Sequence, residues 1–253
     1  MSTAVWCSIR LVAATSSFLQ NSNIRPLEVD MLLSIDTSTQ VMGIALYDDP
    51  VVVGEMQWTS ANHHTVELTT AVDLLMTRCG VKPVDLTLLV VALGPGTFTG
   101  LRIGLAFAKG LAFSLHLPML GVPTFEYMAA SQPLSDSPMA IILPAGRKRL
   151  AVGWFEVQDS IWQSTSKPEV MTPEELSDKI ASPTILCGEL TAAERQTVSR
   201  KWKNAQLTSP AQAARHPSML AEVGWQRWQA GQRHDPVLLA PIYLHIAGGG
   251  LPE

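Results

Sequence analysis

The sequence predicts an α/β fold with two lobes of similar architecture. Two successive runs of strand-like and helix-like patterns, one from Met31 and one after Pro118, each open with strands before their helices. The chain of 253 residues, 47% apolar and 16% charged, is long enough to bury two modest cores. We therefore expect a first lobe over residues 31–135 and a second lobe, with the C-terminal helix, over residues 136–245.

Residues 1–30 and 246–253 are expected to flank the fold without contributing to it. The first segment is rich in serine, and Arg10 interrupts its only apolar run, so no secretory signal is predicted. Met31 opens a clean strand pattern and is the expected natural start, with a transit peptide as the minor alternative. No segment reaches the roughly 18 apolar residues of a membrane span, so we expect a cytoplasmic protein without membrane contact.

The first lobe is predicted to open with an antiparallel meander. Its strands are MLLSID (31–36), QVMGIALYD (40–48) and VVVGEMQWT (51–59). A helix follows over residues 63–79, with an apolar face at helical spacing formed by Leu68, Ala71, Val72, Leu75 and Cys79. LTLLVVAL (86–93) is a continuous apolar run typical of an interior strand, and a long helix begins after the glycine loop that follows it.

The second lobe is predicted to repeat this order without repeating the sequence. Its expected strands are MAIILPA (139–145), RLAVGWFEV (149–157), IWQSTS (161–166) and TILCG (184–188). TPEELSDKI is a helix with Thr172 as its cap and Pro173 in its first turn. The last helix covers about residues 218–230 and stops at Gly231.

Charge and cysteine content exclude several function classes. A formal net charge of −4 gives no global positive field for nucleic acid, so any RNA contact must be local or shared with a partner. The three cysteines lie far apart without CxxC spacing, which indicates neither a zinc site nor a disulfide framework. The basic hairpin tip Arg147–Arg149 could touch tRNA or an acidic partner, and a solvated tip is the simpler interpretation.

The glycine-rich stretch ALGPGTFTGLRIGLAFAKGLAF (92–113) does not fit a Walker phosphate loop. That loop needs GxxxxGK[ST], whereas Leu101 and Arg102 follow Gly100. Pro95 and Gly96 fit a type II turn with positive φ at the glycine, after which Thr97 or Thr99 caps the helix.

Small residues inside this helix predict a close approach to another element. Gly100, Gly104, Ala108 and Ala112 recur every fourth residue, although glycine inside a helix costs about 1 kcal/mol relative to alanine. The stripe therefore faces either another helix or the protein's own sheet. On the preceding helix, Val66 and Leu74 lie off the predicted buried face and suggest a second contact surface. The candidate partner interface consists of Val66, Leu74, Gly100, Gly104 and Ala108.

Five segments of the chain resemble the TsaB family. They occur in the family's order: LLSIDTST, HHTVEL, GPGTFTGLRIGLAFAKGLA, LPMLGVPTFEYMA and DPVLLAPIYL. The resemblance covers about residues 31–245, is strongest from Val91 to Thr124 and is weak from Pro168 to Arg215. It implies the fold shared by actin, sugar kinases and Hsp70, with two ribonuclease-H-like lobes.

The resemblance also implies a function. TsaB-like proteins are non-catalytic dimerisation subunits that pair, through helices of the first lobe, with TsaD. TsaD transfers a threonylcarbamoyl group to adenosine 37 of tRNA, and the ATPase TsaE joins the pair. We therefore expect a scaffold that activates a TsaD-like subunit and meets a TsaE-like ATPase, with tRNA contacted indirectly through the complex. The alternatives are a stand-alone ATP-dependent enzyme of this fold and a homodimeric interaction module.

Two comparisons within the resemblance argue against an active site in this chain. A TsaD-like enzyme carries HxxxH on its first-lobe helix, whereas Leu68 stands four residues after His64, and a His63–Glu67 pair is the weaker metal-binding alternative. A vestigial nucleotide site could include Asp36, Thr37 and Ser38, the counterparts of the phosphate-binding turn. In the second lobe Pro144 replaces an expected aspartate, so we expect no catalytic residue, metal or cofactor.

Overall fold

The computed structural model describes residues 31–60, 64–201 and 203–244, so the predictions for residues 1–30 and 246–253 lie outside the described chain. The first lobe contains a five-stranded sheet in the order β3-β2-β1-β4-β5. Its strands are β1 (Met31–Asp36), β2 (Val41–Asp48), β3 (Val51–Thr59), β4 (Leu86–Ala92) and β5 (Met119–Val122). β1 to β3 form the predicted antiparallel meander, while β4 and β5 run parallel to β1.

The second lobe repeats this topology. Its sheet has the order β11-β10-β6-β7-β8, with β9 paired to β7. Its strands are β6 (Met139–Pro144), β7 (Leu150–Gln158), β8 (Ile161–Ser164), β9 (Glu169–Met171), β10 (Thr184–Gly188) and β11 (Ala205–Leu207). The central strand β6 again pairs antiparallel with the strand after it, β7, and parallel with the later strand β10, which in turn pairs parallel with β11. Both sheets therefore have the strand order of ribonuclease-H-like lobes, which confirms the predicted fold class.

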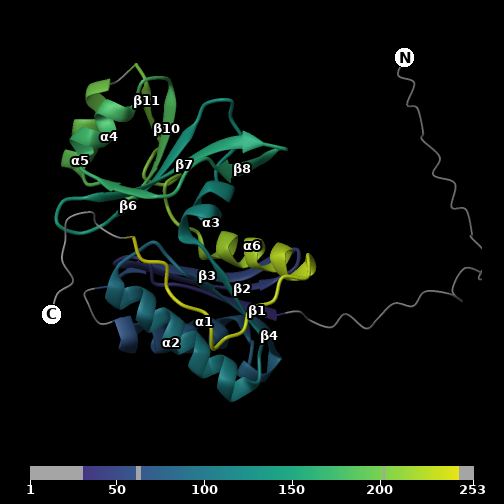
Figure 1. Cartoon of the computed structure of the whole chain (residues 1–253). Helices are drawn as coiled ribbons and strands as arrows, with labels where there is room; N and C mark the ends of the chain where they lie inside the picture. Colours follow the sequence, from purple (N-terminus) through teal and green to yellow (C-terminus); the bar gives the residue numbers. More distant parts are fainter. Residues whose placement is uncertain (1–30, 61–63, 202, 245–253) are drawn as a thin grey trace, which may run out of the picture.

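The helices complete a layered arrangement. They are α1 (His64–Cys79), α2 (Phe98–Leu115), α3 (Thr124–Ala130), α4 (Pro173–Lys179), α5 (Ala192–Val198) and α6 (Pro217–Gln229), with short 3₁₀ turns at Pro83–Asp85 and Ser199–Lys201. α1 and α2 cover the outer face of the first sheet, α3 and α6 lie between the sheets, and α4 and α5 cover the second sheet (Figure 1). Three apolar cores separate these layers, and the middle core joins both lobes.

Local sequence signals explain several helix ends. Thr97 caps α2 by accepting a hydrogen bond from the backbone N–H of Gly100 at 3.3 Å, one of the two predicted caps. Thr172 caps α4 as predicted, and the carboxylate of Glu175 returns the bond to the Thr172 N–H. Thr191 and Glu194 form the same reciprocal pair at the start of α5.

The position of the last helix corrects the predicted domain division. We expected it in the second lobe, within residues 136–245, but α6 packs on the inner face of the first sheet. A Cβ added to Gly224 would lie 2.4 Å from Cγ2 of Val90 in β4, so only glycine permits this approach. Beyond α6 the chain runs back along α2, where Nζ of Lys109 donates to the carbonyl of Leu239 at 2.8 Å.

Helix α2 also corrects the expectation that no segment is long and apolar enough for a membrane span. Within the described ranges it is the one helix that meets this criterion, with a mean hydropathy of 1.2 over 18 residues. Glycine and alanine make up part of this helix, so it meets the criterion without a continuous run of large apolar side chains. Six of its residues are buried against the protein, so the helix has the packing of a core element on one side.

Candidate functional site

The turn after β1 is buried between the lobes and bonded internally. Asp36, Thr37 and Ser38, the predicted vestigial nucleotide site, are each at most 1% exposed. Oδ1 of Asp36 accepts the backbone N–H of Ser38 at 2.8 Å, and Thr37 Oγ1 donates to the carbonyl of Gly100 at 2.8 Å. The hydroxyl oxygens of Ser38 and Thr124 are 2.8 Å apart. These three side chains therefore use their polar atoms on the protein itself.

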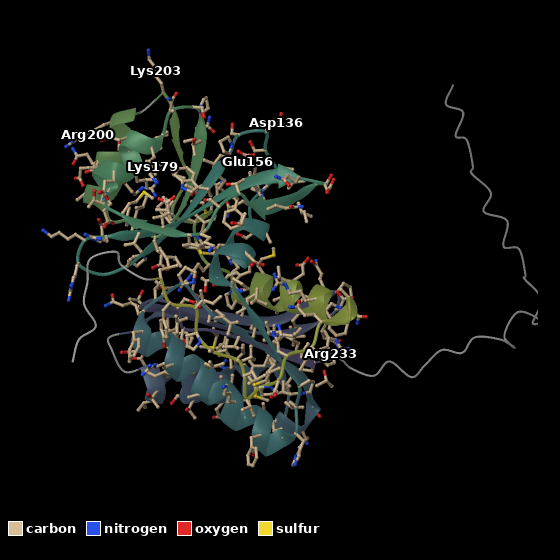
Figure 2. The ribbon with its side chains drawn as sticks, in the orientation of Figure 1. Asp136, Glu156, Lys179, Arg200, Lys203 and Arg233 are labelled. Atoms are coloured by element: carbon tan, nitrogen blue, oxygen red, sulfur yellow. The ribbon has the colours of Figure 1, made fainter. Side chains whose placement is uncertain are left out.

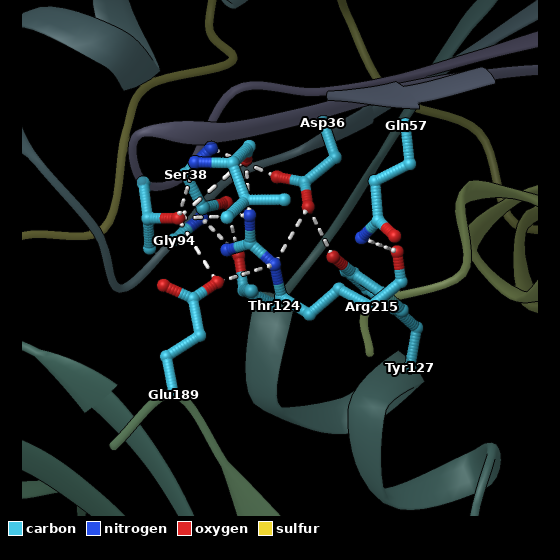
Figure 3. A network of polar contacts seen from close by, with 10 residues as sticks. Asp36, Ser38, Gln57, Gly94, Thr124, Tyr127, Glu189 and Arg215 are labelled. Atoms are coloured by element: carbon cyan, nitrogen blue, oxygen red, sulfur yellow. Dashed lines mark hydrogen bonds and ion pairs between the residues drawn. The ribbon is translucent and has the colours of Figure 1, made fainter. Parts of the chain in front are cut away.

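An arginine distant in sequence completes this cluster (Figure 3). Nε of Arg215 lies 3.3 Å from Oδ2 of Asp36 and 3.3 Å from Oε1 of Glu189, and the arginine side chain is 1% exposed. Its Nη2 donates to Oγ1 of Thr39 at 3.0 Å and also to the carbonyl of Val41. The guanidinium thus bridges a carboxylate from the first lobe and one from the second.

Burial and charge perturb the ionisation of this cluster. Burial raises the pKa of Glu189, while the nearby Arg215 and the hydrogen bond from Thr39 lower it, leaving the pKa above its ordinary value. Burial and the charge of Asp36 raise the pKa of Tyr127, whose hydroxyl donates to Asp36. Burial lowers the pKa of Arg215, but Asp36, Tyr127 and Glu189 together hold it above the ordinary value. Arg215 is accordingly a permanent cation.

An open cleft of about 670 Å³ adjoins the cluster. Its lining combines Gln57 and Trp58 of β3 and the neighbouring Arg215 with Glu194 and Arg195 of the second lobe. The amide of Gln57 donates to the backbone carbonyl of Arg215 at 2.8 Å, and Arg195 donates to the carbonyl of Thr208 at 2.7 Å. The side chains of Gln57 and Arg195 are therefore engaged with their own chain.

The small-residue stripe of α2 is a correction to the predicted partner interface. Gly100, Gly104 and Ala108 are buried, and the two glycines lie against the turn after β1. A Cβ on Gly100 would lie 2.3 Å from the carbonyl oxygen of Thr37, and one on Gly104 would lie 2.1 Å from Oγ1 of Thr37. The stripe therefore allows α2 to approach the protein's own β-layer and leaves no room there for a second molecule.

The glycines of the preceding loop serve the same approach. A Cβ on Gly96 would lie 2.2 Å from the carbonyl oxygen of Ser38. The predicted type II turn at Pro95 and Gly96 is wrong, because that turn requires a positive φ at Gly96, whereas the positive φ, 102°, belongs to Gly94.

The outward faces of α1 and α2 carry uncovered apolar side chains. Val66 is 71% exposed and Leu74 is 42% exposed on α1, as expected for a contact surface. On α2, Phe113 is 87% exposed, and a Cβ on Gly110 would meet no atom within 4 Å. Ala106 is exposed one turn before Gly110, so a second pair of small residues at four-residue spacing faces outward. We call these five residues the outer helix face.

Sequence reasoning missed Ala106, Gly110 and Phe113 as members of this surface. The signal was present, because Ala106 and Gly110 repeat the spacing of the buried stripe on another side of the same helix. Only the position of the sheet distinguishes the two stripes.

The outer surface of the second lobe differs from the outer helix face. Figure 2 labels Asp136, Glu156, Lys179, Arg200 and Lys203 on this lobe, and all five are exposed. Charges of both signs are therefore exposed there, which is typical of a solvated surface.

The described residues offer no ligand set for the alternative metal site. His63 lies outside the described chain, and Glu67 accepts a hydrogen bond from Nε1 of Trp58 at 3.0 Å. In the ranges given above, no three His, Cys, Asp or Glu side chains are grouped to hold a metal ion.

Comparisons with known proteins match this chain to TsaB and TsaD proteins. A family model described as TsaD, tRNA N6-adenosine threonylcarbamoyltransferase, matches residues 58–244. The tRNA threonylcarbamoyladenosine biosynthesis protein TsaB of Bacillus subtilis is 31% identical over 220 residues, which cover 85% of this chain and 94% of that protein. TsaB of Escherichia coli is 30% identical over 152 residues, which cover 59% of this chain and 65% of the relative.

Two further matches define the breadth of the similarity. A tRNA N6-adenosine threonylcarbamoyltransferase of Thermus thermophilus is 30% identical over 146 residues, covering 51% of this chain and 44% of that protein. A solved structure described as YeaZ from Pseudomonas aeruginosa superposes with a TM-score of 0.69 at 23% identity, covering 85% of this chain and 100% of that one. The structural match shows the fold.

Proposed function

This chain belongs to the TsaB family, and we propose that it acts in the biosynthesis of threonylcarbamoyladenosine in tRNA as a non-catalytic subunit. The observation that carries the proposal is the outer helix face, an apolar surface on two adjacent helices that no part of the described chain covers. Exposed apolar side chains gathered in this way are typical of protein–protein contact surfaces.

The proposed role is structural support of a TsaD-like catalytic subunit. Small residues at Ala106 and Gly110 permit a partner helix to approach α2 closely, while Val66, Leu74 and Phe113 supply apolar contacts around it. To activate its partner, the scaffold must bind the competent conformation more tightly than the incompetent one. A TsaE-like ATPase then joins the complex, tRNA is contacted through the catalytic subunit, and the assembly works in the cytoplasm.

The buried polar cluster of Asp36, Tyr127, Glu189 and Arg215, which we call the interlobe cluster, supports the non-catalytic part of the proposal. Asp36, the residue best placed to serve a nucleotide-bound metal, is paired with Arg215 and accepts the hydroxyl of Tyr127. A stand-alone ATP-dependent enzyme would need that carboxylate free. Turnover of ATP by the isolated chain, lost on Asp36→Ala, would favour this alternative enzyme.

The proposal is tested on the double variant Val66→Gln/Leu74→Gln. Both positions are exposed, and glutamine is a good helix former, so the free energy of unfolding should stay within about 0.5 kcal/mol of wild type. Binding to the organism's own TsaD-like subunit, measured by calorimetry, should weaken at least about tenfold.

The matched control is Ile161→Gln. Ile161 is 57% exposed on β8 of the second lobe, remote from the outer helix face, and its loss should leave binding unchanged. Equal affinity of the double variant and wild type would contradict the proposed interface. A one-to-one complex by light scattering supports the scaffold, whereas self-association without a complex supports the homodimeric module.

A further inference from the structure

We propose that Arg215 is a built-in cation that occupies the space between the lobes in place of an external ligand and holds the lobes in one arrangement. The proposal goes beyond the scaffold function, since it concerns how this chain sets its own shape. It rests on the positions of Asp36, Glu189 and Arg215, which come from three separate parts of the sequence (Figure 3).

The geometry makes the guanidinium the shared partner of both lobes. Asp36 ends β1 of the first sheet, Glu189 follows β10 of the second sheet, and Arg215 precedes α6. The same nitrogen, Nε, lies 3.3 Å from a carboxylate oxygen of each lobe. Opening the lobes at this point would separate at least one of these pairs.

The surroundings show that this is a built site and not a surface contact. The side chains of Arg215 and Asp36 are 1% and 2% exposed, and that of Glu189 is 25% exposed. Two further acceptors, Oγ1 of Thr39 and the carbonyl of Val41, receive the Nη2 of Arg215. Removing one partner of a buried ion pair leaves an uncompensated charge, which is strongly destabilising even where the intact pair adds little.

The charge balance explains why a cation is required here. Asp36, which is buried, and Glu189, which is partly exposed, bring two carboxylates to one place between the lobes, and the hydroxyl of Tyr127 donates to Asp36 without adding positive charge. Because the cation is part of the chain, it cannot dissociate. The lobe arrangement therefore does not depend on the concentration of a nucleotide, metal or other small ligand.

Chemical rescue tests this assignment in the full-length chain. Arg215→Ala removes the cation and leaves a space in which free guanidinium can replace it. We expect its Tm to fall by about 6–20 °C relative to wild type. Guanidinium chloride at about 50 mM should then raise the Tm of the variant by about 1–4 °C over sodium chloride of equal ionic strength. In wild type the same addition should leave the Tm unchanged or lower it.

The matched control is Arg227→Ala. Arg227 on α6 pairs with Glu126 away from the interlobe cluster, and its side chain is 25% exposed. Its variant should show no upward shift with guanidinium. A Tm of Arg215→Ala that guanidinium leaves unchanged or lowers, as in Arg227→Ala, would overturn the assignment.

A second variant keeps the test decisive if Arg215→Ala does not fold. Glu189→Ala removes the carboxylate of the second lobe from a partly exposed position and leaves the Asp36–Arg215 pair intact. Hydrogen exchange in residues 36–41 and 188–191 should become at least about threefold faster than in Arg227→Ala. Exchange at the rate of the control would show that the guanidinium does not join the lobes.

Discussion

The interlobe cluster and the outer helix face lie on opposite sides of the same sheet and have opposite chemistry. The cluster is charged and filled, with Arg215 and Asp36 almost fully covered. The outer helix face is apolar and uncovered, with Phe113 at 87% exposure. The cluster fills the space at the turn after β1, and an open cleft of about 670 Å³ adjoins it. The outer helix face is the apolar surface, and its chemistry suits a protein partner.

Helix α2 contains both a buried and an uncovered surface. Gly104 faces the turn after β1 and Gly110 faces open space, although both are interior glycines of the same helix. The difference shows that a glycine can be required for packing inside the protein at one position and remain free for a partner two turns later.

The largest expected effect contrasts these two glycines. Gly104→Leu would place a Cβ 2.1 Å from Oγ1 of Thr37, so we expect a loss of about 3 kcal/mol or more in the free energy of unfolding, or no folded product. Gly110→Ala meets no neighbouring atom and should stabilise the free chain by up to about 1 kcal/mol. Urea unfolding measures both. A Gly104→Leu chain as stable as wild type that merely fails to bind its partner would mean that the buried stripe faces outward.

A smaller effect concerns the pH dependence of stability at Glu189. The native pKa of Glu189 is raised above its ordinary value of 4.5, so the native state binds more protons than the unfolded state between these two values. Stability contributed by this group therefore falls as pH rises through that window and is constant above it.

Glu189→Gln is the reference for this measurement. Glutamine keeps an oxygen that accepts from Oγ1 of Thr39, as Oε1 of Glu189 does at 3.0 Å, but it does not titrate. The stability of wild type minus that of the variant, from urea unfolding between pH 4.5 and about 7.5, should decrease with pH. A difference that increases with pH would show that Arg215 outweighs burial at this carboxylate.

The smallest expected effect on stability concerns the outer helix face. Phe113→Ser removes a large apolar side chain from solvent, so the free energy of unfolding should change by less than about 0.5 kcal/mol. If the interface extends along α2 as far as Phe113, calorimetry with the TsaD-like subunit should show at least about tenfold weaker binding. Unchanged affinity would confine the interface to the side of Val66 and Leu74.

Much of the fold could be predicted because its strands are short apolar runs between clear breaks. β1 and the meander after it match the predicted segments to within one residue, and α1 covers the described part of the predicted helix 63–79. β5 and α3 were not predicted as elements, since four residues of strand and seven of helix give little periodicity. The sheet on which α6 packs could not be predicted either, because an amphipathic pattern does not show which of two sheets the apolar face of a helix covers.

The candidate site was predictable only in part, and for a related reason. The sequence brought Asp36, Thr37 and Ser38 together because they are adjacent, but Arg215 lies 176 residues beyond its partner Thr39 and belongs to no motif. The resemblance was weakest in the segment that contains it. Likewise, the small-residue spacing of α2 was recognised, but the sheet-facing side of the helix is fixed by tertiary packing.

The packing of α6 on the first sheet has a consequence for how this protein can be dissected. Residues 31–135 contain all strands of that sheet, yet without Pro217–Gln229 its inner side would present Leu32, Val90 and Leu120 to water. A fragment of residues 31–135 would therefore expose this apolar surface to water and aggregate. The first sheet is therefore covered on its inner face only when the C-terminal part of the chain is present.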